Sequence, residues 1–199
     1  MRKLFITSIL FLSARFIFAQ DLLSKIPASA NVVAGINTGK LMQLMPAEEW
    51  NNSSFGKKLL EMSSKDPDSK LNSVNDIGIN LAGITYYFHT ENDSIHYNYI
   101  LAPLSDAVKF DALFKDRPFT RLENNTRIIA DPDSTGYMMW NGQQLLYVKG
   151  FLKDQYFNDP VIARRYGLSL PYYYNDSTAV ADSVSPRNLK KPLLWLTQQ

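Results

Sequence analysis

The two histidines of the chain, His89 and His96, lie on either side of the pair Asn92-Asp93. Both flanking segments alternate apolar and polar residues, which predicts a β-hairpin. If Asn92 and Asp93 form a two-residue turn, His89 stands directly opposite His96, with Cβ atoms about 4.5–5.5 Å apart. Two imidazoles at this spacing can share a divalent metal ion, or repel each other when both are protonated. We therefore predict His89 and His96 as candidate metal ligands.

The alternative is that both histidines are ordinary residues on the polar face of a sheet. A catalytic metal site needs three protein ligands and an open position, and the sequence indicates no third ligand. Glu91 and Asp93 stand at the turn, but the pattern does not direct their side chains toward the histidines. The same register predicts an apolar opposite face, made of Ile84, Tyr86 and Phe88 with Leu101, Tyr99 and Tyr97.

Two further segments begin like known ligand loops but lack residues that those loops require. Gly35–Lys40 has three residues between its glycines and Leu41 after the lysine, where a phosphate loop needs four residues and then Ser or Thr. Asp131–Gly136 begins like a calcium loop, yet its twelfth position is Gly142, where a bidentate Glu is needed. We expect the first segment to be a strand exit and the second to be a hairpin turn.

The sequence offers no catalytic constellation. It contains no G-x-S-x-G elbow, and its histidines both lie inside a small hairpin. Glu48, Glu49 and Glu61 fall on a predicted amphipathic helix, where solvated charge is the default. The absence of Cys removes cysteine nucleophiles, thiolate metal sites and disulfides. We predict no catalytic residue and no cofactor. The sequence favours a non-enzymatic role but leaves an enzyme as a third possibility, because carboxylate pairs of the glycosidase kind depend on tertiary structure.

The elements that must position these residues follow a clear order. It is strand 30–37, helix 46–64, a short helix at 71–77, strands 84–90 and 95–101, helix 105–115, several short strands, and helix 154–166. Ser105 is the expected N-cap of its helix. Asn124-Asn125 is a turn signal between short strands, and Asn141-Gly142 is typical of a type I′ hairpin.

This order predicts an α+β fold: a split β-α-β-β-α-β antiparallel sheet with helices on one face, plus a C-terminal hairpin. The length of the chain suits a single α+β domain, which we place at 21–168. Residues 169–199 are predicted as a linker and tail, because polar and small residues prevail from 171 to 186. Apolar residues return near the end without a predicted partner, so we expect a truncated copy of a longer chain.

The first twenty residues have the pattern of a secretory signal. Arg2-Lys3 precedes the apolar run Leu4–Leu12, and Ala19 offers a cleavage site. We predict a signal peptide at 1–20 and an exported protein of the periplasm, outer membrane or cell surface, not a lipoprotein because there is no Cys. An uncleaved anchor is the alternative, but Arg15 interrupts the ~20 apolar residues that a membrane span needs. We expect no transmembrane segment after cleavage.

Removal of this segment changes the charge of the protein. The full chain carries a net charge of +2. Residues 1–20 hold three cations and no acid, so the processed chain carries −1. A nearly neutral domain lacks the electrostatic footprint of a nucleic-acid-binding protein, and we predict that nucleic acid is not a partner.

Several short segments together carry a family resemblance. They are Ile26–Val33, Asp76–Asn80, Tyr86–Phe88, Leu104–Ala107 and Phe110. Over roughly residues 22–148 the chain resembles the N-terminal part of a group of large exported Bacteroidota proteins that are classed as a domain of unknown function. The sequence Phe-Ala-Gln at 18–20 also resembles the end of Bacteroidota signal peptides. The resemblance implies a fold and a compartment, but no activity and no catalytic residue.

Two function classes follow from these observations. The first is a non-catalytic cell-envelope protein with a structural or interaction role, which displays a sheet face or its tail to an envelope protein partner. The alternative is a binding module for a small ligand, a glycan or a metal, supported by the histidines and the many tyrosines. Asp-Ser followed by Thr or an apolar residue also resembles an O-glycosylation signal of exported Bacteroidota proteins, which predicts O-glycans on Ser94, Ser134, Ser177 and Ser183.

Overall fold

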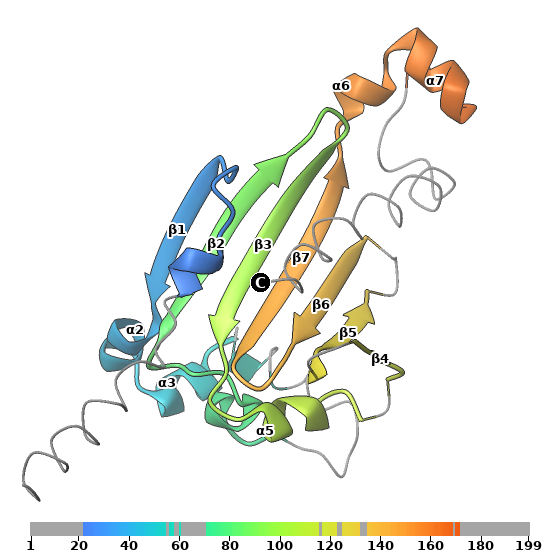
Figure 1. Ribbon diagram of the computed structural model, residues 1–199. Coiled ribbons are helices and arrows are strands. Elements are labelled where there is room, and N and C mark those ends of the chain that lie inside the picture. Colours follow the sequence, from blue (N-terminus) through green and yellow to red (C-terminus); the bar gives the residue numbers. More distant parts are fainter. Residues whose placement is uncertain are drawn as a thin grey trace, which may run out of the picture.

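An antiparallel sheet of seven strands organises the residues that the computed structural model describes (Figure 1). These residues are 22–54, 56, 57, 60, 71–115, 117–122, 125–131, 135–168, 170 and 171. The strand order is β1-β2-β3-β7-β6-β5-β4. The strands are β1 (Val32–Asn37), β2 (Ile84–Glu91), β3 (Ile95–Pro103), β4 (Thr120–Arg121), β5 (Arg127–Ala130), β6 (Gly136–Trp140) and β7 (Gln144–Leu152).

Short helices connect and flank the strands. They are the 3₁₀ helices η2 (Leu22–Lys25) and η4 (Val74–Ile77), and the α-helices α2 (Thr38–Leu44), α3 (Ala47–Asn52), α5 (Ala107–Ala112), α6 (Asp154–Phe157) and α7 (Pro160–Tyr166). Figure 1 shows α2, α3 and α5 gathered at one end of the sheet and α6 and α7 at the other end. The described residues contain both helices and one antiparallel sheet, which confirms the α+β class.

The strand order differs from the split arrangement that the sequence predicted. In that arrangement the strands joined by the first helix would not be adjacent antiparallel partners. Instead β1 lies at an edge of the sheet and pairs antiparallel with β2. The predicted C-terminal hairpin is present as β6–β7, but β7 also pairs with β3 along nine residue pairs, from Ile95↔Leu152 to Pro103↔Gln144. The two nine-residue strands β3 and β7 thus form the centre of the sheet.

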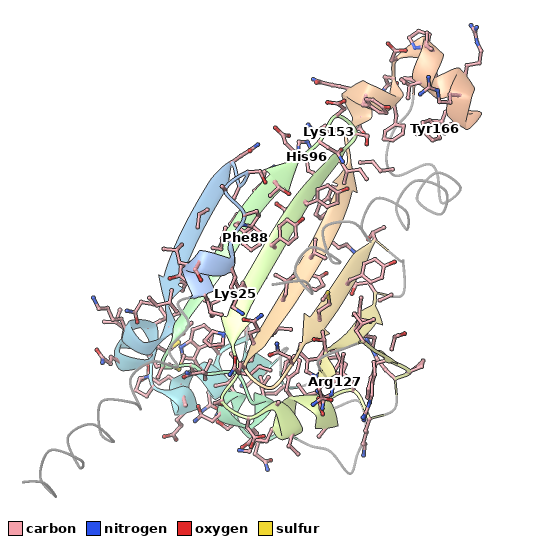
Figure 2. All side chains as sticks on the ribbon, in the orientation of Figure 1. Lys25, Phe88, His96, Arg127, Lys153 and Tyr166 are labelled. Carbon is pink, nitrogen blue, oxygen red and sulfur yellow. The ribbon has the colours of Figure 1, made fainter. Side chains whose placement is uncertain are left out.

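One face of the sheet, here called the aromatic face, carries the larger core. Phe88 of β2 stacks on Tyr99 of β3 with ring centroids 4.4 Å apart, and Val148 of β7 lies beside them, fully buried. η2 covers this face through Leu22, and α6 covers it through Phe157, which is also fully buried. Figure 2 shows Phe88 about halfway along β2. The predicted apolar face is therefore confirmed for Phe88, Tyr97, Tyr99 and Leu101.

The opposite face, here called the histidine face, has a second core at only one of its ends. Trp140 of β6 is 1% exposed and meets Phe110 of α5 edge to face, with ring centroids 5.6 Å apart. Val74 and Ile77 of η4 complete this core. The prediction that the helices share one face is therefore wrong: η2, α6 and α7 pack on the aromatic face, whereas η4 and α5 pack on the histidine face.

The hairpin turns are built by asparagine side chains. Asn92 Oδ1 accepts hydrogen bonds from the backbone N–H groups of Ser94 and Ile95, and Asn141 Oδ1 accepts from those of Gln143 and Gln144. Each asparagine thus occupies the first position of its turn, where its side chain replaces a missing backbone partner. The hairpin predicted at Asn141-Gly142 is present, but its type I′ assignment is wrong, because Gly142 does not have a positive φ.

Helix α5 begins one residue later than predicted. Asp106, not Ser105, is the N-cap, and its carboxylate accepts from the N–H groups of Val108 and Lys109. Ser105 instead donates to the carbonyl of Gly78, which ties the start of α5 to the end of η4. Asp and Ser are N-cap residues of similar preference, so these two neighbouring residues compete for the position.

Several predictions concern residues outside the described part of the chain. The signal peptide at 1–20, nearly all of the tail at 169–199, and Ser134, Ser177 and Ser183 lie there. In the described part, no helix has the length and apolarity that crossing a membrane requires.

Candidate metal site on the histidine face

The two histidines lie on the same face, but they are not direct partners. In the observed register Glu91 pairs with His96, and His89 pairs with Asn98. The predicted pairing of His89 with His96 is therefore wrong by two residues. The physical reason is the position of Asn92, which precedes the two-residue turn instead of forming half of it. A shift of two residues preserves the face of every side chain. The imidazoles are thus diagonal neighbours with ring centroids 5.5 Å apart.

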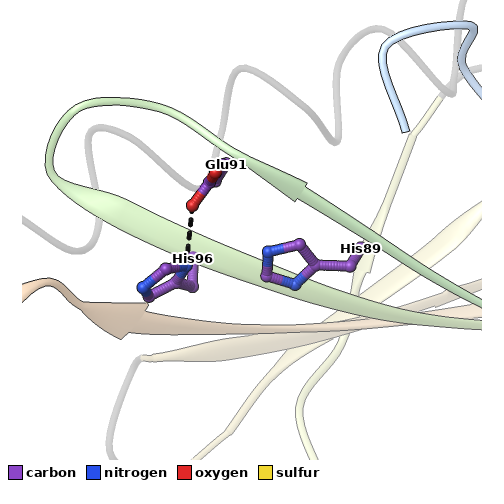
Figure 3. A group of neighbouring side chains, drawn as sticks. All are labelled: His89, Glu91 and His96. Atoms are coloured by element: carbon purple, nitrogen blue, oxygen red, sulfur yellow. Dashed lines mark ion pairs between the residues drawn. The ribbon is translucent and has the colours of Figure 1, made fainter. Parts of the chain in front are cut away.

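Glu91 lies beside His96 in Figure 3 and also contacts Lys153 and Asn31. Its Oε2 atom is 3.0 Å from His96 Nδ1 and 2.7 Å from Lys153 Nζ, while its Oε1 atom accepts from Asn31 Nδ2 at 3.3 Å. The hydrogen bond from Lys153 is the largest of the effects that lower the pKa of Glu91, and the nearby histidines add to it. Glu91 is therefore held as a carboxylate by the cation that follows β7.

The tautomer of His89 follows from its neighbour Asn98. Asn98 Oδ1 accepts a hydrogen bond from the Tyr87 hydroxyl at 2.6 Å and lies 3.0 Å from His89 Nδ1. Because an amide oxygen can only accept, His89 Nδ1 must carry the proton in this contact. In neutral His89 the lone pair of Nε2 is then available. Figure 3 shows the His89 ring extending along the hairpin toward His96 and Glu91.

The sequence predicted two of the three potential ligands and missed Glu91 as the third. One ligand atom from each of His89, Glu91 and His96 lies within 4.8 Å of the others. The side chains of Glu91 and His96 are 36% and 42% exposed, so an ion can reach them from solvent. The signal for Glu91 was present in the alternation: Glu91 is two residues from His89 and therefore shares its face. Only the register places it beside His96.

The other segments singled out in the sequence have structural roles. Asp131, the first residue of the calcium-like segment, accepts from Lys149 Nζ at 3.1 Å and from the Tyr147 hydroxyl at 2.9 Å, and its N–H bonds to the Gly136 carbonyl. This confirms the expected hairpin between β5 and β6, although 132–134 lie outside the described residues.

The phosphate-loop-like segment is a strand exit, as expected. β1 ends at Asn37, whose side chain caps α2 by accepting from the N–H of Lys40. An open hollow of about 440 Å³ lies beside α2 between Lys40 and Ala82. Glu48 and Glu49 are exposed in the first turn of α3, where carboxylates favour the positive end of the helix.

A third polar cluster was not foreseen. Asp111 of α5 pairs with Arg127 of β5 at 2.6 Å and accepts from the Trp140 indole N–H at 2.6 Å. Arg127 is only 11% exposed, so this cluster fastens α5 to the sheet from within the second core. No sequence signal indicated it, because its members are distant along the chain and meet only in the folded sheet.

Comparison of the chain with protein-family models, with curated proteins and with solved structures finds no match. The functional argument therefore depends on the geometry of the described residues.

Proposed function

We propose that this chain is a non-catalytic, exported cell-envelope protein that binds another protein chain by adding a strand to the edge of β1 that faces away from β2. The observation that supports this best is the character of that edge. All six residues of β1 are exposed, and the three largest, Val32, Val33 and Ile36, are 52%, 45% and 48% exposed. The strand contains no charge and no proline.

Such an edge is unusual for a strand that faces only water. Natural sheets protect their edges with charged residues, proline, bulges or very short strands, since unpaired backbone groups recruit other strands. The opposite edge of this sheet follows the rule, because β4 has two residues and one is Arg121. β1 is three times as long and carries none of these side-chain devices. This contrast between the two edges favours β1 as the edge that pairs with a strand of a partner chain.

The backbone of β1 offers hydrogen-bonding groups to a partner. The Thr38 N–H donates to the Gly83 carbonyl, directly beyond the last β1–β2 pair, Asn37↔Ile84. Bonded pairs alternate along an antiparallel ladder, so the N–H and C=O groups of Val33 and Gly35 point away from β2. An extended segment of a partner can accept and donate there, while Val32 and Ile36 supply apolar contact on one face.

Export is part of the proposal and depends on the signal-like residues 1–20. The proposal also includes a location in the cell envelope, membership of the Bacteroidota group of unknown function, and O-glycosylation at Ser94. Ser94 is half-buried in the β2–β3 turn, where its hydroxyl donates to Asn92 Oδ1 at 3.2 Å. Mass spectrometry of the protein from its host tests these points: we expect an N-terminus near Gln20 or Asp21 and hexose-containing mass additions on the peptide with Ser94.

Photo-cross-linking tests the edge. A benzoyl-phenylalanine is placed at Ile36 and, as the control, at Val108, which is 78% exposed on α5 and far from the edge in sequence. Irradiation of envelope fractions should give a defined adduct from position 36 and none from position 108. A lysine at Val32, where natural edges carry such charges, should abolish the adduct, and Val108→Lys should not. Adducts from both positions, or from neither, would refute the proposal. An adduct of twice the chain mass would identify the partner as a second copy.

A further inference from the structure

The hairpin end of the histidine face has the composition and geometry of a metal site, which adjoins β1 because His89 pairs with Val32. The ligand atoms of His89, Glu91 and His96 all lie within 4.8 Å of one another. A tetrahedral zinc ion holds N and O ligands at about 2.0–2.1 Å, which places ligand atoms roughly 3.3 Å apart. Movements on the order of 1 Å close the group around an ion. We propose that His89, Glu91 and His96 bind one divalent transition-metal ion of the zinc class.

The contact between Glu91 and His96 already has the spacing of two ligands. Glu91 Oε2 and His96 Nδ1 are 3.0 Å apart, a distance at which Nδ1–H donates to the carboxylate. A zinc ion bound to both atoms takes the place of this hydrogen bond. Because the ligating nitrogen must be unprotonated, His96 as a neutral ligand carries its proton on Nε2. The third ligand atom is His89 Nε2, so the two histidines coordinate through different ring nitrogens.

Asn98 acts as a positioning residue for this site. Its Oδ1 atom accepts from His89 Nδ1 at 3.0 Å and from the Tyr87 hydroxyl at 2.6 Å. A metal-bound histidine almost always donates its other N–H to an oxygen acceptor, which fixes the tautomer and orients the ring. The Asn98–Tyr87 pair supplies that acceptor from the central strands. Imidazole and carboxylate ligands together favour zinc and its transition-metal neighbours over calcium and magnesium.

Lys153 is an internal competitor for the metal. Its Nζ atom is 2.7 Å from the same Glu91 Oε2 atom that the ion would take. Lys153 joins the end of β7 to α6, and Figure 2 shows it beside His96 at that end of the sheet. A dication on that oxygen is repelled by the neighbouring ammonium group, so Lys153 opposes metal binding. Removal of this cation should therefore strengthen zinc binding.

The experiment is a zinc titration of the full chain, with a chromophoric chelator as competitor. We expect one zinc ion per chain. His89→Ala, His96→Ala and Glu91→Gln should each raise the dissociation constant at least about tenfold, and Asn98→Ala should do so by about tenfold to a hundredfold. Lys153→Met should lower it by about tenfold, the effect of removing one cation about 5 Å from a dication in water. The matched controls are Glu49→Gln on α3 and Lys109→Met on α5, both exposed and outside the site.

Nuclear magnetic resonance gives a second readout that does not depend on affinity. The chain has two histidines, so each ring gives one assignable set of signals. Zinc should shift both rings, with ¹⁵N patterns of an Nε2-bound His89 and an Nδ1-bound His96. Absence of stoichiometric zinc binding by the folded wild-type protein would overturn the proposal. An unchanged dissociation constant in the His89→Ala, His96→Ala double variant would do the same. Weaker binding by Lys153→Met would refute the competition.

Discussion

The buried tyrosine Tyr97 should make the protein lose stability at alkaline pH by an amount that the structure defines. Tyr97 is 4% exposed on the aromatic face, and burial raises its pKa to about 12 from the ordinary value of 10.0. The nearby Tyr99 raises it further, whereas the hydrogen bond from Asn92 opposes the shift. Above pH 10 the unfolded chain loses the phenolic proton that the folded chain retains, so a rise in pH favours unfolding.

The magnitude follows from linkage between proton binding and folding. A shift of about two pKa units corresponds to about 2.7 kcal/mol of unfolding free energy, lost progressively between about pH 10 and pH 12. At about pH 11 roughly half of it, about 1.4 kcal/mol, should be lost through Tyr97. Urea unfolding at about pH 8 and pH 11 measures the total loss. Tyr97→Phe should reduce this loss by about 1.4 kcal/mol.

The comparison between variants isolates Tyr97 from other groups that titrate in this range. Tyr166→Phe, at a tyrosine that is 37% exposed on α7, controls for the removal of one phenol. If Tyr97→Phe and the wild-type protein lose equal stability between about pH 8 and pH 11, then Tyr97 ionises in the folded protein. The inference that burial protects its proton would then be wrong.

Two further predictions concern the packing of the sheet. Asp111→Ala should lower the unfolding free energy by about 2–3 kcal/mol, because it leaves the nearly buried Arg127 without its carboxylate partner. Asp76→Ala removes an exposed pair and should lower the unfolding free energy by less than about 1 kcal/mol. Urea unfolding near neutral pH measures both losses, and equal losses would contradict the structural role of the Asp111–Arg127 pair. Gly136→Ala should lower the unfolding free energy by about 1–3 kcal/mol, because the new Cβ would overlap the carboxylate of Asp131, whereas a Cβ at Gly142 meets open space. Thermal melts should therefore show a lower melting temperature for Gly136→Ala than for Gly142→Ala. The reverse order would show that the β5–β6 hairpin is packed differently.

The faces of the sheet could be predicted from the sequence, whereas the register could not. Alternation along 84–91 and 95–101 correctly assigns Phe88 to the core and His89 to the other face, because side chains of a strand alternate. The turn sets the register, and it was assigned on the assumption that Asn92 takes a central position. Asparagine can also stand first in a turn and accept backbone N–H groups, and the sequence Asn-Asp-Ser is compatible with both geometries.

The same ambiguity affects the second hairpin and shows its general cause. Asn141-Gly142 is the strongest signal for a primed turn, yet Asn141 also stands first and accepts from two N–H groups. The same ambiguity in register affects the prediction of metal ligands. His89 and His96 could be named from the sequence, but Glu91 is recognised as a third candidate ligand only when it pairs with His96. Lys153 is still more remote, since it reaches the group only because β7 pairs with β3.

The place of β7 in the sheet has a consequence for how the chain folds as it is made. β7 lies between β3 and β6, although the chain reaches it after every other described strand, so the side of β3 that faces away from β2 must wait for β7 before it is paired. Until then β3 is the open edge of a β1–β2–β3 sheet, although it later lies at the centre of the complete sheet. Such pairing between distant segments is slow, and an unpaired apolar edge promotes association between chains in the meantime. Before β7 pairs with β3, the chain is therefore prone to associate with other chains through this edge.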